Sequence, residues 1–280
     1  MTFTTLISTE TLERHLDDPG FVIVDCRHDL ADVDAGERAY RAAHLPGAVF
    51  MHIDRDLSGA KTGSNGRHPL PDIGALVPRL GRAGIDATRQ VVAYDQNNGM
   101  FASRLWWLLR WLGHDPVAVL DGGLDRWQAE GRPETNAVPT ARATTFVPKA
   151  PTPVASAEEI VHHLGDDTLF VLDARAAERY RGDVEPIDPV AGHIPGARNR
   201  PYTENMTGHG TFKPAAQLRS EYEALLGPTL PSAVVHQCGS GVTACHNVLA
   251  MSIAGLSGSR LYPGSWSEWV ADPARPVARG

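Results

Sequence analysis

Cysteine is scarce in this chain, with three among 280 residues, at positions 26, 238 and 245. Their spacing matches no metal-ligand motif, and an odd number leaves no complete disulfide framework. The sequence therefore predicts no metal site, and nothing in it indicates a bound cofactor. Cysteines that do not form a disulfide set are typical of a reducing compartment, so we expect a cytoplasmic protein.

Long hydrophobic runs are also missing, and positive charge is not in excess. No apolar stretch approaches the roughly 20 residues that cross a membrane. The N-terminal residues lack the basic and apolar regions of a signal peptide. A formal net charge of −7 argues against a protein that binds the phosphate backbone of nucleic acids. We therefore expect neither a membrane partner nor a nucleic-acid partner.

The chain is long enough for one large or two modest domains, and its repeats favour two. Four short motifs occur twice, in the same order. The pairs are 22–27 and 170–175, 44–48 and 193–197, 91–95 and 234–238, and 120–123 and 261–264. A repeat of this length indicates duplicated domains rather than a solenoid. We predict an N-terminal domain over 1–135, a proline-rich linker over 136–155 and a C-terminal domain over 156–280.

Within each half, apolar β-rich runs alternate with segments of helical character, which predicts an α/β fold with parallel sheets flanked by helices. The expected strands are 21–25, 90–94, 117–120, 169–173, 233–237 and 260–262. The expected helices are 8–16, 72–82, 100–112, 156–164, 215–226 and 243–254. Ser8 and Ser156 have the character of helix N-caps. Sites in open parallel sheets form at the carboxyl ends of strands.

A glycine-rich segment, Cys-Gly-Ser-Gly-Val-Thr at 238–243, follows one predicted strand and precedes a predicted helix. Its glycines let backbone N–H groups turn inward and form an anion-binding nest, and the helix N-terminus adds its positive dipole end. A thiol at this position favours the reactive thiolate form. We therefore predict that Cys238 is a nucleophile. The remaining loop residues expected to bind substrate are Gly239, Gly241, Val242 and Thr243.

The two halves differ at the position of this cysteine. Asp95 in the first half stands where the second half has Cys238. A carboxylate cannot serve as the same kind of sulfur nucleophile. We therefore predict one working site, in the C-terminal half, with the N-terminal half as scaffold and pocket wall.

Several motifs together resemble a known family. The run Cys-Gly-Ser-Gly-Val-Thr-Ala at 238–244 looks like the active loop of 3-mercaptopyruvate sulfurtransferases. The repeated Asp-X-Arg and His-Leu/Ile-Pro-Gly-Ala motifs, with 120–127 and 264–269, are similar to those of tandem rhodanese-domain proteins. The resemblance covers nearly the whole chain. It implies two rhodanese-like domains, of which the second is catalytic.

The reaction that this resemblance implies is a double displacement. The Cys238 thiolate takes the sulfur of 3-mercaptopyruvate and becomes a persulfide, and pyruvate leaves. A thiol acceptor such as thioredoxin or a low-molecular-weight thiol, or cyanide, then removes the outer sulfur. The expected partners are thus a small-molecule sulfur donor and a thiol acceptor, and no cofactor is implied.

The resemblance also implies roles for residues outside the nucleophile's own position. Ser240, His68 and Asp54 match a relay that orients or protonates the leaving enolate. Arg179 matches the first substrate arginine of the family, whose planar guanidinium suits a carboxylate. Thiosulfate-using members carry basic residues directly after the cysteine. This loop has no lysine or arginine, which favours a donor with a single carboxylate.

The chain departs from the family pattern in one place. A second arginine often precedes the second His-Ile-Pro-Gly motif, and residues 185–192 contain none near Ile187. Either Arg67 or Arg104 takes over its contact with the donor, or the affinity for the donor carboxylate is lower. Two alternatives therefore stay open, a thiosulfate sulfurtransferase (rhodanese) and a persulfide carrier that loads once without turnover.

Other residues of reactive type are expected to be structural. His44 and His193 recur in both halves, including the half without a nucleophile, which predicts a shared hydrogen bond to a backbone carbonyl. Cys26 and Cys245 are expected to be buried thiols. The chain also lacks the loop arginine that a cysteine phosphatase needs to bind phosphate.

Overall fold

The computed structural model describes residues 2–96, 98–140, 142–166 and 168–280; Met1, Asn97, Ala141 and Asp167 lie outside the described residues. The chain forms two compact units. The first contains Met1–Gly59, Pro71–Thr152 and Gly208–Phe212. The second contains Ala60–Leu70, Pro153–Thr207 and Lys213–Gly280. Each half of the sequence therefore gives one short segment to the unit formed mainly by the other half.

The first unit is built on a five-stranded sheet in the order β1-β5-β4-β2-β3, and every pairing in it is parallel. Its strands are β1 (Leu6–Ile7), β2 (Phe21–Asp25), β3 (Val49–Phe50), β4 (Gln90–Tyr94) and β5 (Val117–Leu120). β2, β4 and β5 have the predicted bounds. β4 is buried along its whole length, as expected for a strand covered on both faces.

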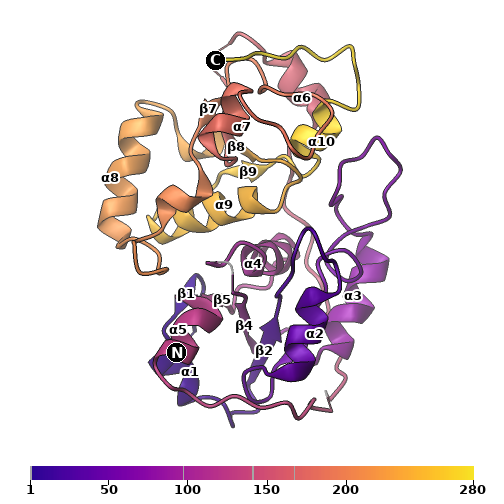
Figure 1. Cartoon of the computed structure of the whole chain (residues 1–280), viewed down its shortest axis with the longest axis vertical. Helices are drawn as coiled ribbons and strands as arrows, with labels where there is room; N and C mark the ends of the chain where they lie inside the picture. The colour runs from indigo at the N-terminus through magenta and orange to yellow at the C-terminus, as the bar shows by residue number, and fades with distance from the viewer. Residues whose placement is uncertain (1, 97, 141, 167) are drawn as a thin grey trace. The chain divides into compact units, whose positions relative to one another are not determined.

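The helices of this unit are α1 (Thr9–Glu13), α2 (Ala35–Ala42), α3 (Ile73–Arg82), α4 (Ala102–Trp111) and α5 (Gly123–Ala129). The predicted cap of α1 is confirmed, because Ser8 Oγ accepts the N–H of Thr11 at 3.1 Å. Asp72 caps α3 in the same way, through the N–H of Ala75 at 3.0 Å. In Figure 1 the strands of this unit lie between α1 and α5 on one side and α2 and α3 on the other.

The second unit repeats the arrangement with a four-stranded parallel sheet in the order β7-β6-β8-β9. Its strands are β6 (Phe170–Asp173), β7 (Arg198–Asn199), β8 (Val234–Gln237) and β9 (Arg260–Leu261). This order matches β3-β2-β4-β5 of the first unit strand for strand. At the place of β1, the N–H of Ala155 donates to the Leu261 carbonyl at 2.9 Å. The predicted fold, two parallel α/β domains of one design, is therefore confirmed.

The helices of the second unit are α6 (Ala157–His162), α7 (Ala177–Arg181), α8 (Ala215–Leu226), α9 (Thr243–Ile253) and α10 (Ser265–Trp269), with 3₁₀ turns η1 (Tyr202–Asn205) and η2 (Pro231–Ala233). Ser156 Oγ accepts the N–H of Glu159 at 3.2 Å, which confirms the predicted cap of α6. In Figure 1, α9 runs beside α8 and close to β8. The sequence predicted α6, α8 and α9 but neither of the short helices α7 and α10.

The repeated Asp-X-Arg motif builds the same buried ion pair in both units. Arg27 Nη2 lies 2.7 Å from Asp25 Oδ2, and Arg175 Nη2 lies 2.7 Å from Asp173 Oδ2. Each guanidinium also donates to a backbone carbonyl of a following loop. A buried charge needs such partners, so these arginines tie each strand end to its loop.

The repeated histidines have the shared structural role that the sequence predicts. His44 Nδ1 lies 2.6 Å from the Tyr40 carbonyl oxygen, and His193 Nδ1 lies 2.8 Å from that of Tyr180. Each imidazole also stacks on the ring of its tyrosine, at 4.1 and 3.9 Å between centroids. Since the same contacts occur in both units, they belong to the fold and not to the chemistry.

Both sheets pack on apolar cores that include large tryptophans. Trp127 in the first unit and Trp266 and Trp269 in the second are fully buried. Trp127 and Trp269 each donate their indole N–H to a proline carbonyl, at 2.8 and 2.9 Å. Their burial is therefore achieved without an unsatisfied polar group. Among the described residues, no helix combines the length and apolar character needed to cross a membrane.

Candidate active site at the end of β8

The loop at 238–242 joins the carboxyl end of β8 to the start of α9, as the sequence predicts. Gly241 has a φ of 77°, in the left-handed region that favours glycine. A Cβ placed on Gly241 would lie 2.3 Å from the backbone oxygen of Pro263. Any larger residue would collide with that backbone, so the curvature of the loop depends on this glycine.

The Cys238 sulfur lies inside this loop, and the residue is 2% exposed. The N–H of Gly241 donates to Sγ at 3.1 Å, and the N–H of Cys238 itself donates to Ser265 Oγ at 3.1 Å. α9, which begins at Thr243 just after Val242, directs its N-terminus toward this loop. Backbone N–H groups and a helix N-terminus both favour negative charge nearby. The surroundings therefore suit an anionic sulfur, either thiolate or persulfide.

The other two cysteines are buried, as predicted, and all three are free thiols. Cys245 Sγ donates to the carbonyl oxygen of Gly241 at 3.2 Å and so stabilises the turn. Burial raises the pKa of the Cys26 thiol well above its ordinary value, and the nearby carboxylates of Asp25 and Asp95 add to this effect. Cys26 therefore stays protonated, which makes it a poor nucleophile.

Residues 60–70 bring His68 to the loop, although they belong to the first half of the sequence. His68 Nδ1 lies 2.8 Å from Ser240 Oγ, and both residues are buried. The N–H of Arg67 donates to Ser267 Oγ at 3.0 Å, which fastens the segment beside α10. Two of the three residues predicted for the relay are therefore joined by a hydrogen bond.

Two guanidinium groups lie over the residue that follows the nucleophile. A Cβ placed on Gly239 would lie 2.7 Å from Arg67 Nη2 and 3.7 Å from Nη1 and Nη2 of Arg179. The structure thus brings Arg179 together with one of the two proposed replacements for the missing arginine. Arg104, the other replacement, is fully buried in α4 of the first unit.

Two buried carboxylates hold these guanidinium groups. Glu185 Oε1 accepts from Arg179 Nη2 at 2.6 Å and from the N–H groups of Ile187 and Asp188 at 3.1 Å each. Asp188 pairs with Arg67 through Oδ1, and its Oδ2 lies 3.3 Å from Arg179 Nη2. The sequence analysis missed both acids because it searched this stretch for a second arginine.

Asp54, the third residue predicted for the relay, belongs to the first unit. Its Oδ2 lies 3.9 Å from His28 Nε2, and its N–H donates to His52 Nδ1 at 3.0 Å. The structure therefore does not place Asp54 in the same compact unit as Ser240 and His68.

His28, His52 and Asp54 offer potential metal-ligand atoms within 4.8 Å of one another. His52 Nε2 lies 2.8 Å from the Val33 carbonyl oxygen, and His52 Nδ1 accepts backbone N–H groups of the following turn. A metal ion would have to displace one of these backbone bonds. These hydrogen bonds indicate that His52 anchors the loop and does not serve as a metal ligand.

Two other histidines lie near the nucleophile in the sequence, and neither is placed as a base. Burial lowers the pKa of His236 on β8 to about 3, so its ring is neutral at physiological pH. A general base works best with a pKa near the working pH. On α9, His246 Nδ1 lies 3.1 Å from Asn205 Nδ2, inside a buried polar network. A papain-type cysteine hydrolase therefore finds no support here.

Ser265, the first residue of α10, is a site residue that the sequence analysis missed. Its φ of 53° lies in the left-handed region, which residues other than glycine rarely adopt. Its hydroxyl donates to the Tyr262 carbonyl at 2.9 Å while accepting the N–H of Cys238. The structure shifts the last repeated motif by one residue relative to the sequence pairing, because Leu124 and Trp266 make equivalent hydrogen bonds. With that shift, Gly-Gly at 122–123 stands against Gly-Ser at 264–265, which was the available signal.

In the first unit, the corresponding loop holds a carboxylate where the second holds sulfur. Asp95 Oδ1 accepts the N–H of Gly99 at 2.9 Å, and Oδ2 accepts those of Phe101 and Ala102 at 2.8 Å each. This aspartate is fully buried. The nest in the first unit is therefore filled by the side chain of the loop itself.

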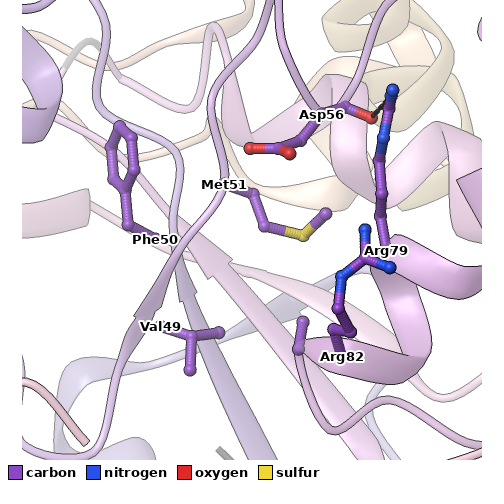
Figure 2. A pocket seen from close by; sticks show the side chains of 7 residues that line it. Val49, Phe50, Met51, Asp56, Arg79 and Arg82 are labelled. Atoms are coloured by element: carbon purple, nitrogen blue, oxygen red, sulfur yellow. Dashed lines mark hydrogen bonds between the residues drawn. The ribbon is translucent and has the colours of Figure 1, made fainter. Parts of the chain in front are cut away.

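A cavity of about 230 Å³ lies elsewhere in the first unit, between β3 and α3. Figure 2 shows Arg79 and Arg82 projecting from α3 along it, with Met51 and Asp56 nearby. Arg79 Nη1 donates to the backbone oxygen of Asp56 at 3.2 Å. None of the predicted site residues lines this cavity, so we place the candidate active site at the Cys238 loop.

Comparison with known proteins agrees with this architecture. The family model for the rhodanese-like domain matches residues 8–130 and 156–272. The chain is 47% identical over 281 residues to a probable 3-mercaptopyruvate sulfurtransferase of Pseudomonas aeruginosa, covering 98% of each chain. It is 39% identical over 269 residues to a putative thiosulfate sulfurtransferase of Mycobacterium tuberculosis, covering 92% of this chain and 90% of that one.

A solved structure shows the same similarity in three dimensions. The 3-mercaptopyruvate sulfurtransferase of Leishmania major superimposes with a TM-score of 0.85 at 30% identity, covering 98% of this chain and 75% of that one. These three findings agree: the family model matches twice, a relative is similar along the full length, and a solved structure has the same fold. The chain belongs to the rhodanese-like family and carries two copies of its domain.

Proposed function

We propose that this protein is a sulfurtransferase that takes sulfur from 3-mercaptopyruvate onto Cys238 and passes it to a thiol or to cyanide, releasing pyruvate. The observation that carries the proposal is the Cys238 sulfur in its backbone nest, where the N–H of Gly241 donates to it at 3.1 Å. The name of the Pseudomonas aeruginosa relative supports the same activity.

In the donor half-reaction, the Cys238 thiolate attacks the sulfur of 3-mercaptopyruvate. The new S–S bond forms as the C–S bond breaks, and its electron pair stays on carbon as the enolate of pyruvate. Ser240, bonded to His68 at 2.8 Å, is the group we assign to orient the enolate or deliver the proton that completes pyruvate. Asp54 as a third member of this relay remains part of the proposal.

In the acceptor half-reaction, a second thiolate attacks the outer sulfur of the Cys238 persulfide. The persulfide S–S bond breaks, Cys238 leaves as thiolate and the acceptor carries the sulfur away. The nest of N–H groups stabilises the negative sulfur in both states. Gly239, Val242 and Thr243 contribute the rest of that loop. We propose thioredoxin or a low-molecular-weight thiol as the acceptor, following the family resemblance. The three free cysteines support a reducing cytoplasm as its location.

Thiosulfate is a second candidate donor, favoured by one observation. Two guanidinium groups, from Arg67 and Arg179, lie over Gly239 even though the loop itself carries no basic residue. Guanidinium groups suit a dianion as well as a carboxylate. The carboxylates of Glu185 and Asp188, however, already pair with these arginines, and this charge balance favours the donor with a single negative charge.

The domain limits also remain a proposal, with 1–135 and 156–280 as the two domains and 136–155 as the linker. The family model supports it through its two matched ranges. The exchanged segments 60–70 and 208–212 mean that such domains are sequence repeats and not independent structural units.

Steady-state turnover with 3-mercaptopyruvate and with thiosulfate, using one thiol acceptor and cyanide, tests the function. We expect a higher kcat/KM for 3-mercaptopyruvate, with pyruvate release equal to sulfur transferred. A preference for thiosulfate would overturn the donor assignment. A single loading of Cys238 by either donor, without turnover, would mean that the protein is a persulfide carrier.

A further inference from the structure

One carboxylate joins the two arginines of the candidate donor site. Asp188 pairs with Arg67 through Oδ1 and with Arg179 through Oδ2. Its side chain is 3% exposed, while those of Arg67 and Arg179 are 30% and 17% exposed. The carboxylate therefore lies behind the arginines, which are the more accessible groups.

Both guanidinium groups that this carboxylate holds lie close to the loop. Asp188 bonds to Nη1 of Arg67, whereas Nη2 of Arg67 lies nearest to the position of a Cβ on Gly239, at 2.7 Å. In Arg179 it contacts Nη2, and both Nη1 and Nη2 of Arg179 lie 3.7 Å from that position. Asp188 thus fixes the orientation of two groups that face the residue after the nucleophile.

Glu185 and Asp188 differ in how firmly they are held as anions. Burial alone would raise the pKa of Glu185, but hydrogen bonds from Arg179 and from the N–H of Asp188 outweigh it and lower the pKa. Burial dominates for Asp188 and raises its pKa, although Arg67 and Arg179 act in the opposite direction. Glu185 is therefore the structural partner of Arg179, and Asp188 is the less strongly stabilised charge.

The formal charges of this cluster cancel. Arg67 and Arg179 contribute two positive charges, and Glu185 and Asp188 contribute two negative charges. Arg175, which also contacts Glu185 at 3.4 Å, is balanced by its own ion pair with Asp173. A donor with one negative charge leaves the occupied cluster at minus one, and a dianion leaves it at minus two. In a partly buried site each excess charge is costly, because an effective dielectric constant of about 20 screens it poorly.

We propose that Asp188 is a specificity-determining residue, whose carboxylate positions Arg67 and Arg179 and lowers their net charge so that a monoanionic sulfur donor is preferred over a dianionic one. This inference rests on the proposed sulfurtransferase function. It assigns to Arg67 the contact for which the family pattern has a second arginine, and it adds to the preference for a monoanion that the uncharged loop already favours.

The substitution Asp188→Asn tests the proposal because it keeps the shape of the side chain and removes its charge. We expect the ratio of kcat/KM for thiosulfate to kcat/KM for 3-mercaptopyruvate to rise about tenfold or more, since one full charge is removed beside the donor. Asp183→Asn is the matched control, because Asp183 is nearby in sequence but 55% exposed. An unchanged ratio, or an equal loss for both donors, would overturn the proposal.

The substitution Arg67→Gln distinguishes a role of Arg67 in binding the donor from a role in supporting the fold of the loop. We expect the KM for 3-mercaptopyruvate to rise by about tenfold, as for a lost charge-assisted contact. The rate at which preformed persulfide passes to the acceptor should change little, since the donor carboxylate has then left. Equal losses in both half-reactions would instead mean that Arg67 only supports the fold of the loop.

Calorimetric titration with pyruvate and with sulfate gives an answer that does not depend on turnover. We expect Asp188→Asn to bind sulfate about tenfold more tightly than the wild type, with a smaller change for pyruvate. If the wild type turned over neither donor, the proposed function would fail while this titration still tested Asp188. Unchanged sulfate affinity in a folded variant would refute the role of Asp188.

Discussion

The loop after β4 and the loop after β8 are two versions of one design. Both follow a buried central strand and lead into a helix, and both turn backbone N–H groups toward the first side chain of the loop. In the first unit, Asp95 fills the nest with its own carboxylate and accepts three N–H groups. In the second unit, the sulfur of Cys238 lies there and accepts the N–H of Gly241. The two loops thus share a backbone shape that directs N–H groups inward, and they differ in the side chain that accepts these groups, a carboxylate in one and a sulfur in the other.

A second contrast lies beneath these loops. The backbone N–H of Leu124 donates to Asp95 O, and that of Trp266 donates to Cys238 O, each at 2.9 Å. The residue just before each donor has a positive φ, 54° at Gly123 and 53° at Ser265. The second unit therefore keeps a backbone shape suited to glycine but has a serine there. For a residue with a side chain, this conformation costs about 1–2 kcal/mol. The hydrogen bond from the Cys238 N–H to the Ser265 hydroxyl is a reason for a serine at this position despite that cost.

The largest expected effect comes from removing the sulfur that distinguishes the second loop from the first. Cys238→Ser should reduce sulfur transfer by at least about a thousandfold, because an oxygen cannot carry the persulfide. The variant should stay folded, since serine fits where cysteine did. Turnover assays, with mass spectrometry of the peptide after incubation with donor, check the loss of sulfur transfer, and circular dichroism checks that the variant is folded. Substantial turnover in this variant would rule out Cys238 as the sulfur carrier.

The reverse change removes the anion from the first loop. Asp95→Ala should destabilise the first unit by roughly 3–5 kcal/mol, because three buried N–H groups lose a charged acceptor. Asp95→Asn, which keeps one carbonyl acceptor, should lose less. Hydrogen exchange of β4 and α4, measured by mass spectrometry, would report the loss locally. Unchanged exchange in both variants would show that the carboxylate does not hold this loop.

The strand that precedes the second loop should make the stability of the protein depend on pH, whereas the corresponding strand of the first unit should not. His236 on β8 lies where β4 has Ala93, and burial lowers its pKa to about 3. Below the unfolded pKa of about 6.5 the unfolded chain takes up a proton that the folded chain refuses, so stability falls as pH falls. Between pH 7 and pH 5 the loss should be about 2 kcal/mol. His236→Ala should make the free energy of unfolding less dependent on pH. Denaturant unfolding at several pH values measures this. An equal pH dependence in the wild type and the variant would show that His236 is not its source.

The smallest effect should come from restoring glycine beneath the second loop. Ser265→Gly should leave the stability unchanged or raise it by about 1 kcal/mol, because glycine adopts the same φ without strain. The donor half-reaction should slow by roughly tenfold as the Cys238 N–H loses its acceptor. Ser265→Ala is the matched comparison, since it removes the hydroxyl but keeps the strain. If both variants kept full activity, the serine would have no part in positioning the nucleophile.

Elements with a clear period or a long apolar run could be predicted from the sequence, and short ones could not. β4 and α8 were expected at their observed bounds because each shows an unbroken pattern. β7 and α10 have too few residues to show a period, and their positions are set by pairing and packing with the rest of the unit. Local sequence thus determines the long elements, and tertiary contacts determine the short ones.

For the candidate site as well, local sequence predicted some features and tertiary contacts determined the others. The Cys238 loop could be recognised because its nucleophile, glycines and helix are contiguous. The contact between His68 and Ser240 joins residues 172 positions apart, and no spacing rule predicts it; the resemblance to a family suggested it. The pairing of Arg67 with Asp188, 121 positions apart, came from the structure, because charge complementarity across folded segments leaves no local pattern.

The segment that carries Arg67 and His68 has an evolutionary consequence. It is encoded in the first repeat but folds with the second. A gene shortened to the second repeat would keep Cys238 and lose both of these side chains. If sulfur transfer depends on these two side chains, as proposed, selection for it would retain the first repeat, although that repeat has Asp95 in place of the cysteine.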